Sequence, residues 1–151
     1  NLKAIKKGPF ISVREMSRVV EPYFRDFKIK ASSLESKVST LSGGNQQKVV
    51  IARTMNVNPE LIILDEPTKG IDIGSKNEIY ELINELALRN TAIIMISSEI
   101  PELIAMSDRF IVMAEGRIVC ELPKEEATES LIMEKAVSSF KTKNQTTLEG
   151  K

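Results

Sequence analysis

Cysteine, net charge and long apolar runs are all scarce in this sequence. The single cysteine among 151 residues, Cys120, excludes a disulfide framework or a cysteine metal cluster, and we expect it to be a small buried hydrophobe. The 21 basic and 21 acidic side chains cancel, so nothing indicates nucleic acid or an anionic membrane as a partner. No apolar run approaches the roughly 20 residues that cross a bilayer, which predicts a soluble chain.

Helical and strand patterns alternate along the chain. Apolar residues spaced by three and four predict a helix over 12–27, opened by a capping box of Ser12 and Glu15 and kinked or broken near Pro22. Short branched apolar runs at 61–64 and 92–96 are typical of parallel strands covered on both faces. The alternation predicts an α/β domain with a mainly parallel sheet. A further helix begins at a capping box of Ser75 and Glu78 and carries an apolar stripe of Ile79, Leu82, Ile83 and Leu86. The other expected helices are from Ser42 to about Val57, over 99–106 and over about 128–137, and residues 110–113 and 118–121 should form a hairpin. Loops are expected over 30–40 and 68–74, and a frayed polar tail over 138–151.

Two acids follow the first strand run. Asp65 and Glu66 come directly after 61–64, at the carboxyl end of a buried strand, where α/β sheets bind ligands. In nucleotide hydrolases the first such acid holds Mg²⁺, and the second can polarise the attacking water. The alternative is a strand that simply ends in solvated acids, with Pro67 forcing the turn.

Two glycines open the helix that begins at Ser42. The first backbone N–H groups of a helix have no internal partners and carry the positive end of its dipole. Because Gly43 and Gly44 lack a Cβ, they would let a phosphate approach these amides beside the Ser42 hydroxyl. The alternative is that Ser42 is an ordinary N-cap and the glycines form a loose turn.

These segments resemble one family when they are taken together. LSGGNQQK, residues 41–48, is similar to the signature motif of ATP-binding cassette (ABC) ATPases, and LIILDEPTKGID, residues 61–72, resembles their Walker B strand and D-loop. The likeness covers about 12–137 and extends to the second cassette of ATPases that drive bacterial importers of ribose- and galactose-type sugars. It implies part of a P-loop NTPase core, with a helical signature region at about 12–57 and an α/β core at about 58–137.

The resemblance also implies roles for individual residues. In this family ATP lies between two cassettes, and each signature helix faces the nucleotide held by the other cassette. Asp65 would then help to hold Mg²⁺, Glu66 would orient or activate the hydrolytic water, and Asp72 would contact the partner cassette. The residues that would approach the γ-phosphate of the partner's ATP are Ser42, Gly43, Gly44 and Gln46.

Two features depart from the family pattern. None of the seven glycines stands in a GxxxxGK[ST] arrangement, so the phosphate-cradling loop of Walker A is absent. We therefore expect the chain to be the C-terminal part of a longer protein, and the 151 residues alone neither to hydrolyse nor to bind MgATP tightly. The family's usual histidine after the second strand is replaced by Ser98, which the sequence favours as the N-cap of the 99–106 helix. Without that histidine, the site containing Glu66 would be weak or non-hydrolysing.

Three interpretations follow. The first is a piece of a sugar-importer ATPase at the cytoplasmic face of the membrane, with permease subunits contacting the helical part near 12–41. The second is a cassette of a DNA-repair or chromosome-organising ATPase, which the absence of a heptad run and the balanced charge disfavour. The third is a non-enzymatic module that folds and dimerises but binds no nucleotide alone. An exposed sheet edge and an apolar helix face would make self-association of the chain a liability.

Overall fold

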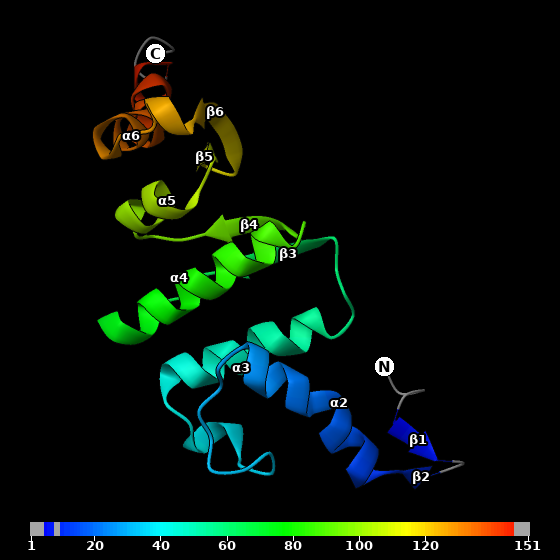
Figure 1. Ribbon diagram of the computed structural model, residues 1–151. Helices are drawn as coiled ribbons and strands as arrows, with labels where there is room; N and C mark the ends of the chain where they lie inside the picture. Colours follow the sequence, from blue (N-terminus) through cyan, green and yellow to red (C-terminus); the bar gives the residue numbers. More distant parts are fainter. Residues whose placement is uncertain (1–4, 8–9, 147–151) are drawn as a thin grey trace. The chain divides into compact units, whose positions relative to one another are not determined.

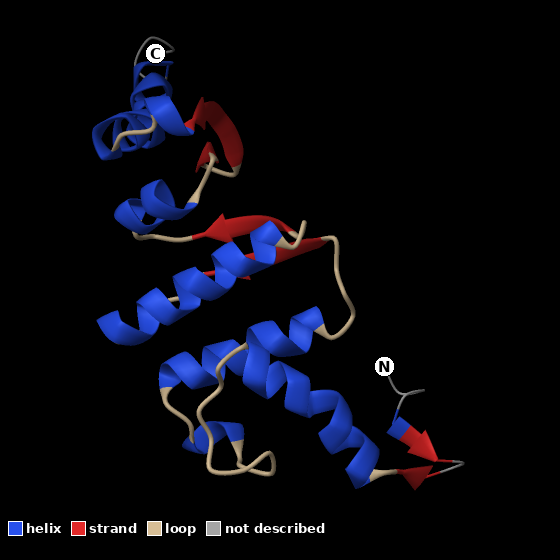
Figure 2. Ribbon diagram, viewed as in Figure 1, coloured by secondary structure: helices blue, strands red, loops and turns tan. Residues whose placement is uncertain are grey.

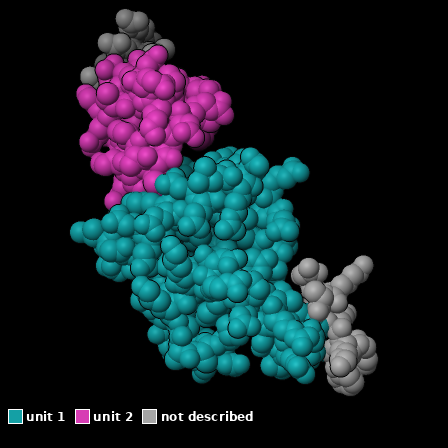
Figure 3. Space-filling model, viewed as in Figure 1, with its two compact units in different colours: residues 1–96 teal, residues 97–151 magenta. Residues whose placement is uncertain are grey.

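The computed structural model describes residues 5–7 and 10–146. The chain divides into two compact units, residues 1–96 and residues 97–151 (Figure 3). The division falls at Ile96, within the 58–137 segment that the sequence assigns to one α/β core. Among the described residues, no helix combines the length and apolar character needed to cross a membrane.

In the described part of the first unit, α-helices pack around one parallel strand pair (Figure 1). The helix α2 begins after Ser12, whose Oγ accepts a hydrogen bond from the Glu15 backbone N–H at 3.3 Å, as the sequence predicts. The sequence predicts a kink or a break near Pro22. A break is wrong, because α2 continues through this residue. The elements of this unit are β1 (Lys6–Lys7), β2 (Phe10–Ile11), α2 (Val13–Asp26), a 3-10 turn (Val38–Thr40), α3 (Gly43–Met55), β3 (Leu61–Asp65), α4 (Ile73–Leu88) and β4 (Ala92–Ile96).

The parallel pairing predicted from the apolar runs is present between β3 and β4 (Figure 2). Ile62 and Leu64 are buried, and the predicted stripe of α4 is buried as well. The expectation of two covered faces is wrong for the described residues, because the alternate side chains of both strands are exposed. Leu61, Ile63, Ile94 and Ile96, which are 47–62% exposed, form what we call the open face. The α/β class is confirmed, with a parallel sheet of only two described strands.

The second unit is a hairpin packed with two helices. β5 (Arg109–Ala114) and β6 (Arg117–Pro123) pair antiparallel around a turn at Glu115 and Gly116, both with positive φ, as in the tight turns that suit hairpins. Cys120 is half-buried against this unit's core rather than fully buried. The core comprises Phe110, Val112, Leu122, Ala127 and Ile132, and the helices are α5 (Ile100–Met106) and α6 (Glu129–Thr146).

Three predicted boundaries differ from the structure. α6 continues beyond Val137 to Thr146, so most of the predicted polar tail is helical, and residues 147–151 lie outside the described residues. The cap of α4 is Asp72 rather than Ser75, and the helix therefore starts inside the predicted loop. Glu99, not Ser98, occupies the N-cap position of α5, and the Ser97 hydroxyl accepts from the Glu99 N–H at 3.0 Å. The N-cap explanation of Ser98 is therefore wrong.

Candidate functional site

The signature segment, residues 41–48, forms the first turns of α3 and the two residues before them. Ser42 is the N-cap residue, but its side chain makes no capping hydrogen bond to the helix backbone. Its Oγ instead accepts from Asn45 Nδ2 at 2.8 Å, and Asn45 Oδ1 accepts from the Lys30 backbone N–H at 2.7 Å. The Ser42 hydroxyl is therefore not used for an ordinary side-chain cap, and its proton can be donated to another group.

The two glycines of this segment have different surroundings. Gly43 is exposed, and a Cβ placed there would be no closer than 3.9 Å to any atom outside its immediate surroundings, the nearest being the Gly70 carbonyl oxygen. Gly44 is buried, and a Cβ there would lie 2.6 Å from Ser75 Cβ and 2.8 Å from Ser75 Oγ. Gly44 is therefore required for the close packing of α3 on α4. From the sequence we expected Gly44 to lack a side chain so that a phosphate could approach its amide, and that interpretation did not include this packing role.

The Gln46 side chain turns back on its own segment. Its Nε2 donates to the Leu41 carbonyl oxygen at 2.8 Å, and its backbone N–H donates to the Ser42 carbonyl at 2.9 Å. Asn45, which the sequence analysis did not single out, is the amide side chain that contacts the Ser42 hydroxyl.

The two acids after β3 are placed differently from each other. Asp65 is the last residue of the strand, is exposed, and belongs by strand alternation to the side of the open face. Glu66 is half-buried and has a φ of 49°, a left-handed conformation that is uncommon for residues other than glycine. Its N–H donates to the Ile96 carbonyl at 2.8 Å, which joins the turn to β4. Strained backbone of this kind is concentrated at functional sites.

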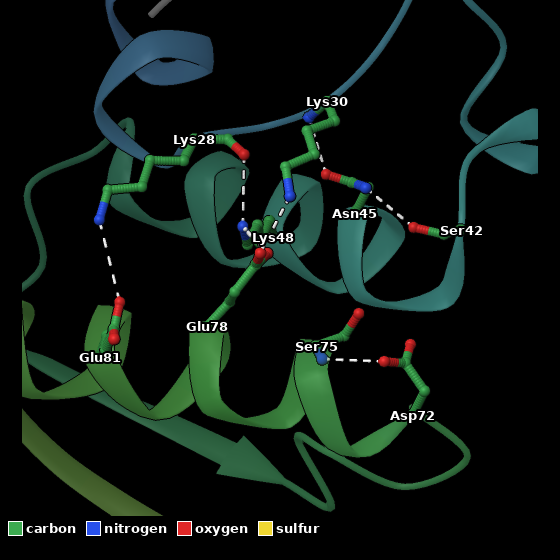
Figure 4. A network of polar contacts seen from close by, with 9 residues as sticks. All are labelled: Lys28, Lys30, Ser42, Asn45, Lys48, Asp72, Ser75, Glu78 and Glu81. Atoms are coloured by element: carbon green, nitrogen blue, oxygen red, sulfur yellow. Dashed lines mark hydrogen bonds and ion pairs between the residues drawn. The ribbon is translucent and has the colours of Figure 1, made fainter.

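Asp72 begins α4. Its Oδ1 accepts the Ser75 backbone N–H at 3.0 Å, so this carboxylate is the helix cap (Figure 4). Hydrogen bonds from the backbone and then the side chain of Ser75 hold the pKa of Asp72 below its ordinary value. It is therefore an anion at neutral pH.

α3 and α4 bring part of the predicted site together. The two helices pack against each other, and Figure 4 shows Ser42 and Asp72 at the same end of the pair. The signature turn and the start of α4 therefore form one continuous surface of the first unit. The remaining predicted site residue, Ser98, belongs to the second unit.

A polar network that the sequence analysis missed lies behind this surface. Lys48 is only 2% exposed, and its Nζ donates to Glu78 Oε2 at 2.7 Å and to the Lys28 carbonyl at 3.3 Å. Glu78 Oε1 accepts from Lys30 Nζ at 3.0 Å. Glu78 thus pairs with two ammonium groups rather than completing a capping box. The signal for this network was present, because Lys48 shares helical spacing with the buried Gly44, Ile51 and Ala52.

Comparisons with known proteins agree with these motifs. A family model described as ABC transporter matches residues 6–69. The ribose import ATP-binding protein RbsA of Caldanaerobacter subterraneus is 51% identical over 140 residues, which are 90% of this chain and 28% of that protein. The xylose import ATP-binding protein XylG of Moorella thermoacetica is 49% identical over 134 residues, 87% of this chain and 27% of that protein. The chain therefore spans about a quarter of the length of these curated relatives.

Solved structures match the fold. A nucleotide-free ATP-binding cassette from an ABC transporter aligns with a TM-score of 0.68 and 25% identity, over 82% of this chain and 47% of that one. A dimeric post-hydrolysis state of the cassette MJ0796, bound to ADP and Pi, aligns with a TM-score of 0.65 and 24% identity, over 79% of this chain and 51% of that one. In sequence and in fold, the chain matches part of the ABC transporter ATPases.

Proposed function

We propose that this chain is part of the ATPase of a sugar importer and supplies the signature helix, the Walker B acids and the D-loop for ATP-driven uptake of a monosaccharide. The main support is the identity of about 50% over about 90% of the chain to proteins named for ribose and xylose import. The geometry adds that the signature turn and the start of α4 share one surface, with an available Ser42 hydroxyl.

In this proposal the ATP phosphates that meet Ser42 and Gly43 belong to a nucleotide held by another cassette. The first turn of α3, which is exposed at Gly43, would offer helix N-terminal backbone N–H groups and the positive end of the helix dipole to an anion. The solved cassette MJ0796, which is dimeric and bound to ADP and Pi, supports a shared site of this kind. Asp72, an anion beside the same surface, would contact the partner cassette.

The Walker B acids would serve the nucleotide of this chain's own cassette. No group of three metal-binding side chains occurs among the described residues, but Mg²⁺ is ordinarily held by one or two carboxylates together with waters and substrate phosphates. Asp65 fits that requirement, and Mg²⁺ bound there would neutralise charge on the phosphates. Glu66 would orient the hydrolytic water. Because the chain has no histidine, we propose that the nucleotide site containing Glu66 hydrolyses ATP weakly.

We further propose that the importer works at the cytoplasmic face of the membrane, with permease subunits contacting the region of residues 12–41. For the chain alone, the absence of a GxxxxGK[ST] loop predicts weak binding of MgATP. Calorimetric titration measures this affinity, and a micromolar dissociation constant would contradict the prediction.

The signature turn can be tested at Gly43, where the structure leaves room for a side chain. In the full-length protein, Gly43→Asp would place a carboxylate at the phosphate position, whereas Gly43→Asn has nearly the same shape without the charge. A carboxylate in the first turn favours helix formation, so folding should survive. We expect Gly43→Asp to lower ATP turnover by about tenfold or more relative to Gly43→Asn, as the loss of one charge-stabilising contact does in other enzymes.

Glu66→Gln provides the comparison between the two sites. If the Glu66 site hydrolyses weakly, this variant should reduce turnover less than Gly43→Asp does. The proposal is wrong if Glu66→Gln abolishes turnover while Gly43→Asp matches Gly43→Asn. Gly44→Asp is a poorer probe, because the side chain would meet Ser75.

A further inference from the structure

The ion pair of the buried Lys48 with the half-buried Glu78 is the most enclosed charged contact described in the first unit. Lys48 is 2% exposed, whereas the other described ion pairs of this unit join side chains that are at least 36% exposed at both ends. A buried ammonium is costly unless a partner and hydrogen bonds satisfy it. Here Glu78 Oε2 lies at 2.7 Å and the Lys28 carbonyl at 3.3 Å. Because the buried Lys48 ammonium needs both acceptors, it restricts the positions of Glu78 and of the Lys28 carbonyl.

The pair lies at matching heights on two helices that run in the same direction (Figure 4). Lys48 is six positions after the N-cap Ser42, and Glu78 is six positions after the N-cap Asp72. At 1.5 Å per residue, each charged residue lies about 9 Å along its helix from the N-cap. Nearer the N-termini, Gly44, two positions after Ser42, packs against Ser75, three positions after Asp72. The two helix starts are therefore held side by side.

This arrangement is electrostatically unfavourable unless something holds it. Parallel neighbouring helices place their positive dipole ends together, and these ends repel each other mildly but jointly favour an anion. The Lys48–Glu78 contact opposes sliding of α3 along α4. Glu78 also accepts from Lys30, whose backbone N–H holds Asn45, and Asn45 in turn donates to Ser42. The same carboxylate is therefore linked to the signature turn by a second route.

We propose that Lys48 is a positioning residue, buried and paired with Glu78, that fixes the register of α3 on α4 and so sets the signature turn in place relative to the start of α4. This inference rests on the proposed function for its catalytic consequence. It assigns no contact between Lys48 and the nucleotide. A one-turn slip of about 5.4 Å would break the pair and separate Ser42 from Asp72.

The test uses Lys48→Met in the full-length protein. Methionine fills the path of the lysine stem without the charge, and Glu78 keeps Lys30 as a partner and remains 38% exposed, so the variant should fold. We expect kcat for ATP to fall by about tenfold, because small misplacements of groups around reacting atoms cost up to about 10²-fold. KM should be unchanged, and Lys48→Arg should recover part of the loss. The matched control is Glu81→Gln, one turn along α4, whose pair with Lys28 is 3.9 Å long and exposed at both ends.

Hydrogen exchange provides a readout that does not depend on activity. Amides of residues 43–48 and 73–78 should exchange faster in Lys48→Met than in wild type or Glu81→Gln. Unchanged exchange together with unchanged kcat would overturn the inference. If the wild-type protein hydrolyses no ATP, the proposed function fails, and exchange alone decides the role of Lys48. If Lys48→Met does not fold, Glu78→Gln replaces it, since it leaves Lys48 an oxygen acceptor, and its exchange and kcat are judged in the same way.

Discussion

At the scale of single residues, the paired glycines of the signature turn have separate physical causes. Gly44 is buried against α4 and has no space for a Cβ, whereas Gly43 is exposed and has space. Adjacent identical residues thus serve two purposes, helix packing at Gly44 and access to the backbone amides at Gly43. A sequence pattern alone does not separate them, because both positions fall in the first turn of the same helix.

This difference predicts opposite effects of the same substitution. Gly44→Ala should destabilise the chain by about 1–3 kcal/mol, the usual cost of forcing extra volume into a packed contact. Gly43→Ala should be neutral or stabilise by up to about 1 kcal/mol, because alanine restricts the unfolded chain. Urea unfolding monitored by circular dichroism measures both. Equal effects of the two variants would show that the α3–α4 contact at Ser75 is not as close as described.

At the scale of elements, α3 and α4 are joined by charge as well as by apolar packing. Glu78 accepts from Lys48 and Lys30, and Asp72 accepts from Ser75. Hydrogen bonds from Lys48 and then Lys30 lower the pKa of Glu78 below its ordinary value of 4.5. The helix pair therefore depends on carboxylates that stay ionised.

The lowered pKa values predict acid sensitivity of this helix pair. A carboxyl group with a lower pKa in the folded state contributes stability above its unfolded pKa, and this contribution is lost as the pH falls through the folded value. The melting temperature should therefore decline as the pH falls below about 4.5, the ordinary value for Glu78. Glu78→Gln should flatten that decline because its side chain does not titrate. Melting curves between about pH 6 and pH 3, with Glu81→Gln as the control, measure the effect. An identical decline in wild type and Glu78→Gln would contradict it.

At the scale of the whole molecule, the main exposed feature of the first unit is the open face. Leu61, Ile63, Ile94 and Ile96 lie on paired parallel strands and are 47–62% exposed. Contiguous apolar patches of this kind mark surfaces that are covered in an assembly or that cause aggregation. The sequence led us to expect a sheet edge and an apolar helix face as the surfaces that favour self-association, whereas this patch is a face of the sheet.

We expect the isolated chain to self-associate through this face. Ile63→Lys should raise the dissociation constant of the self-associated form by about tenfold or more, because a charge would be buried in an apolar contact. The matched control is Leu88→Lys at the end of α4, which adds the same charge at a residue that is 85% exposed and off the sheet. Sedimentation velocity over a range of concentrations measures the association. A monomeric wild-type chain, or equal effects of the two variants, would contradict the prediction.

The local sequence was sufficient to predict most helices and strands and the resemblance to ABC ATPases. Apolar spacing placed α2 and α4, the start at Ser42 and the stop before Pro59 placed α3, and the branched runs placed β3 and β4. The signature and Walker B segments indicated the ABC ATPases. These features depend on neighbours within about one helical turn or on strand alternation. Capping was less predictable, since Asp72 and Ser75 both suit the start of α4 and only the backbone path selects Asp72.

Tertiary structure decided what the residues do for one another. The sequence by itself determined that two glycines and a serine begin α3 and that two acids end β3. Only packing revealed that Gly44 faces Ser75, that Lys48 is buried on Glu78, and that Asn45 rather than Gln46 contacts the Ser42 hydroxyl. The physical reason is that the Gly44–Ser75 and Lys48–Glu78 contacts join segments about 30 positions apart, where helix–helix geometry rather than local preference sets which side chains meet. The local contact of Asn45 with Ser42 depends in turn on the Lys30 backbone, which holds the Asn45 amide.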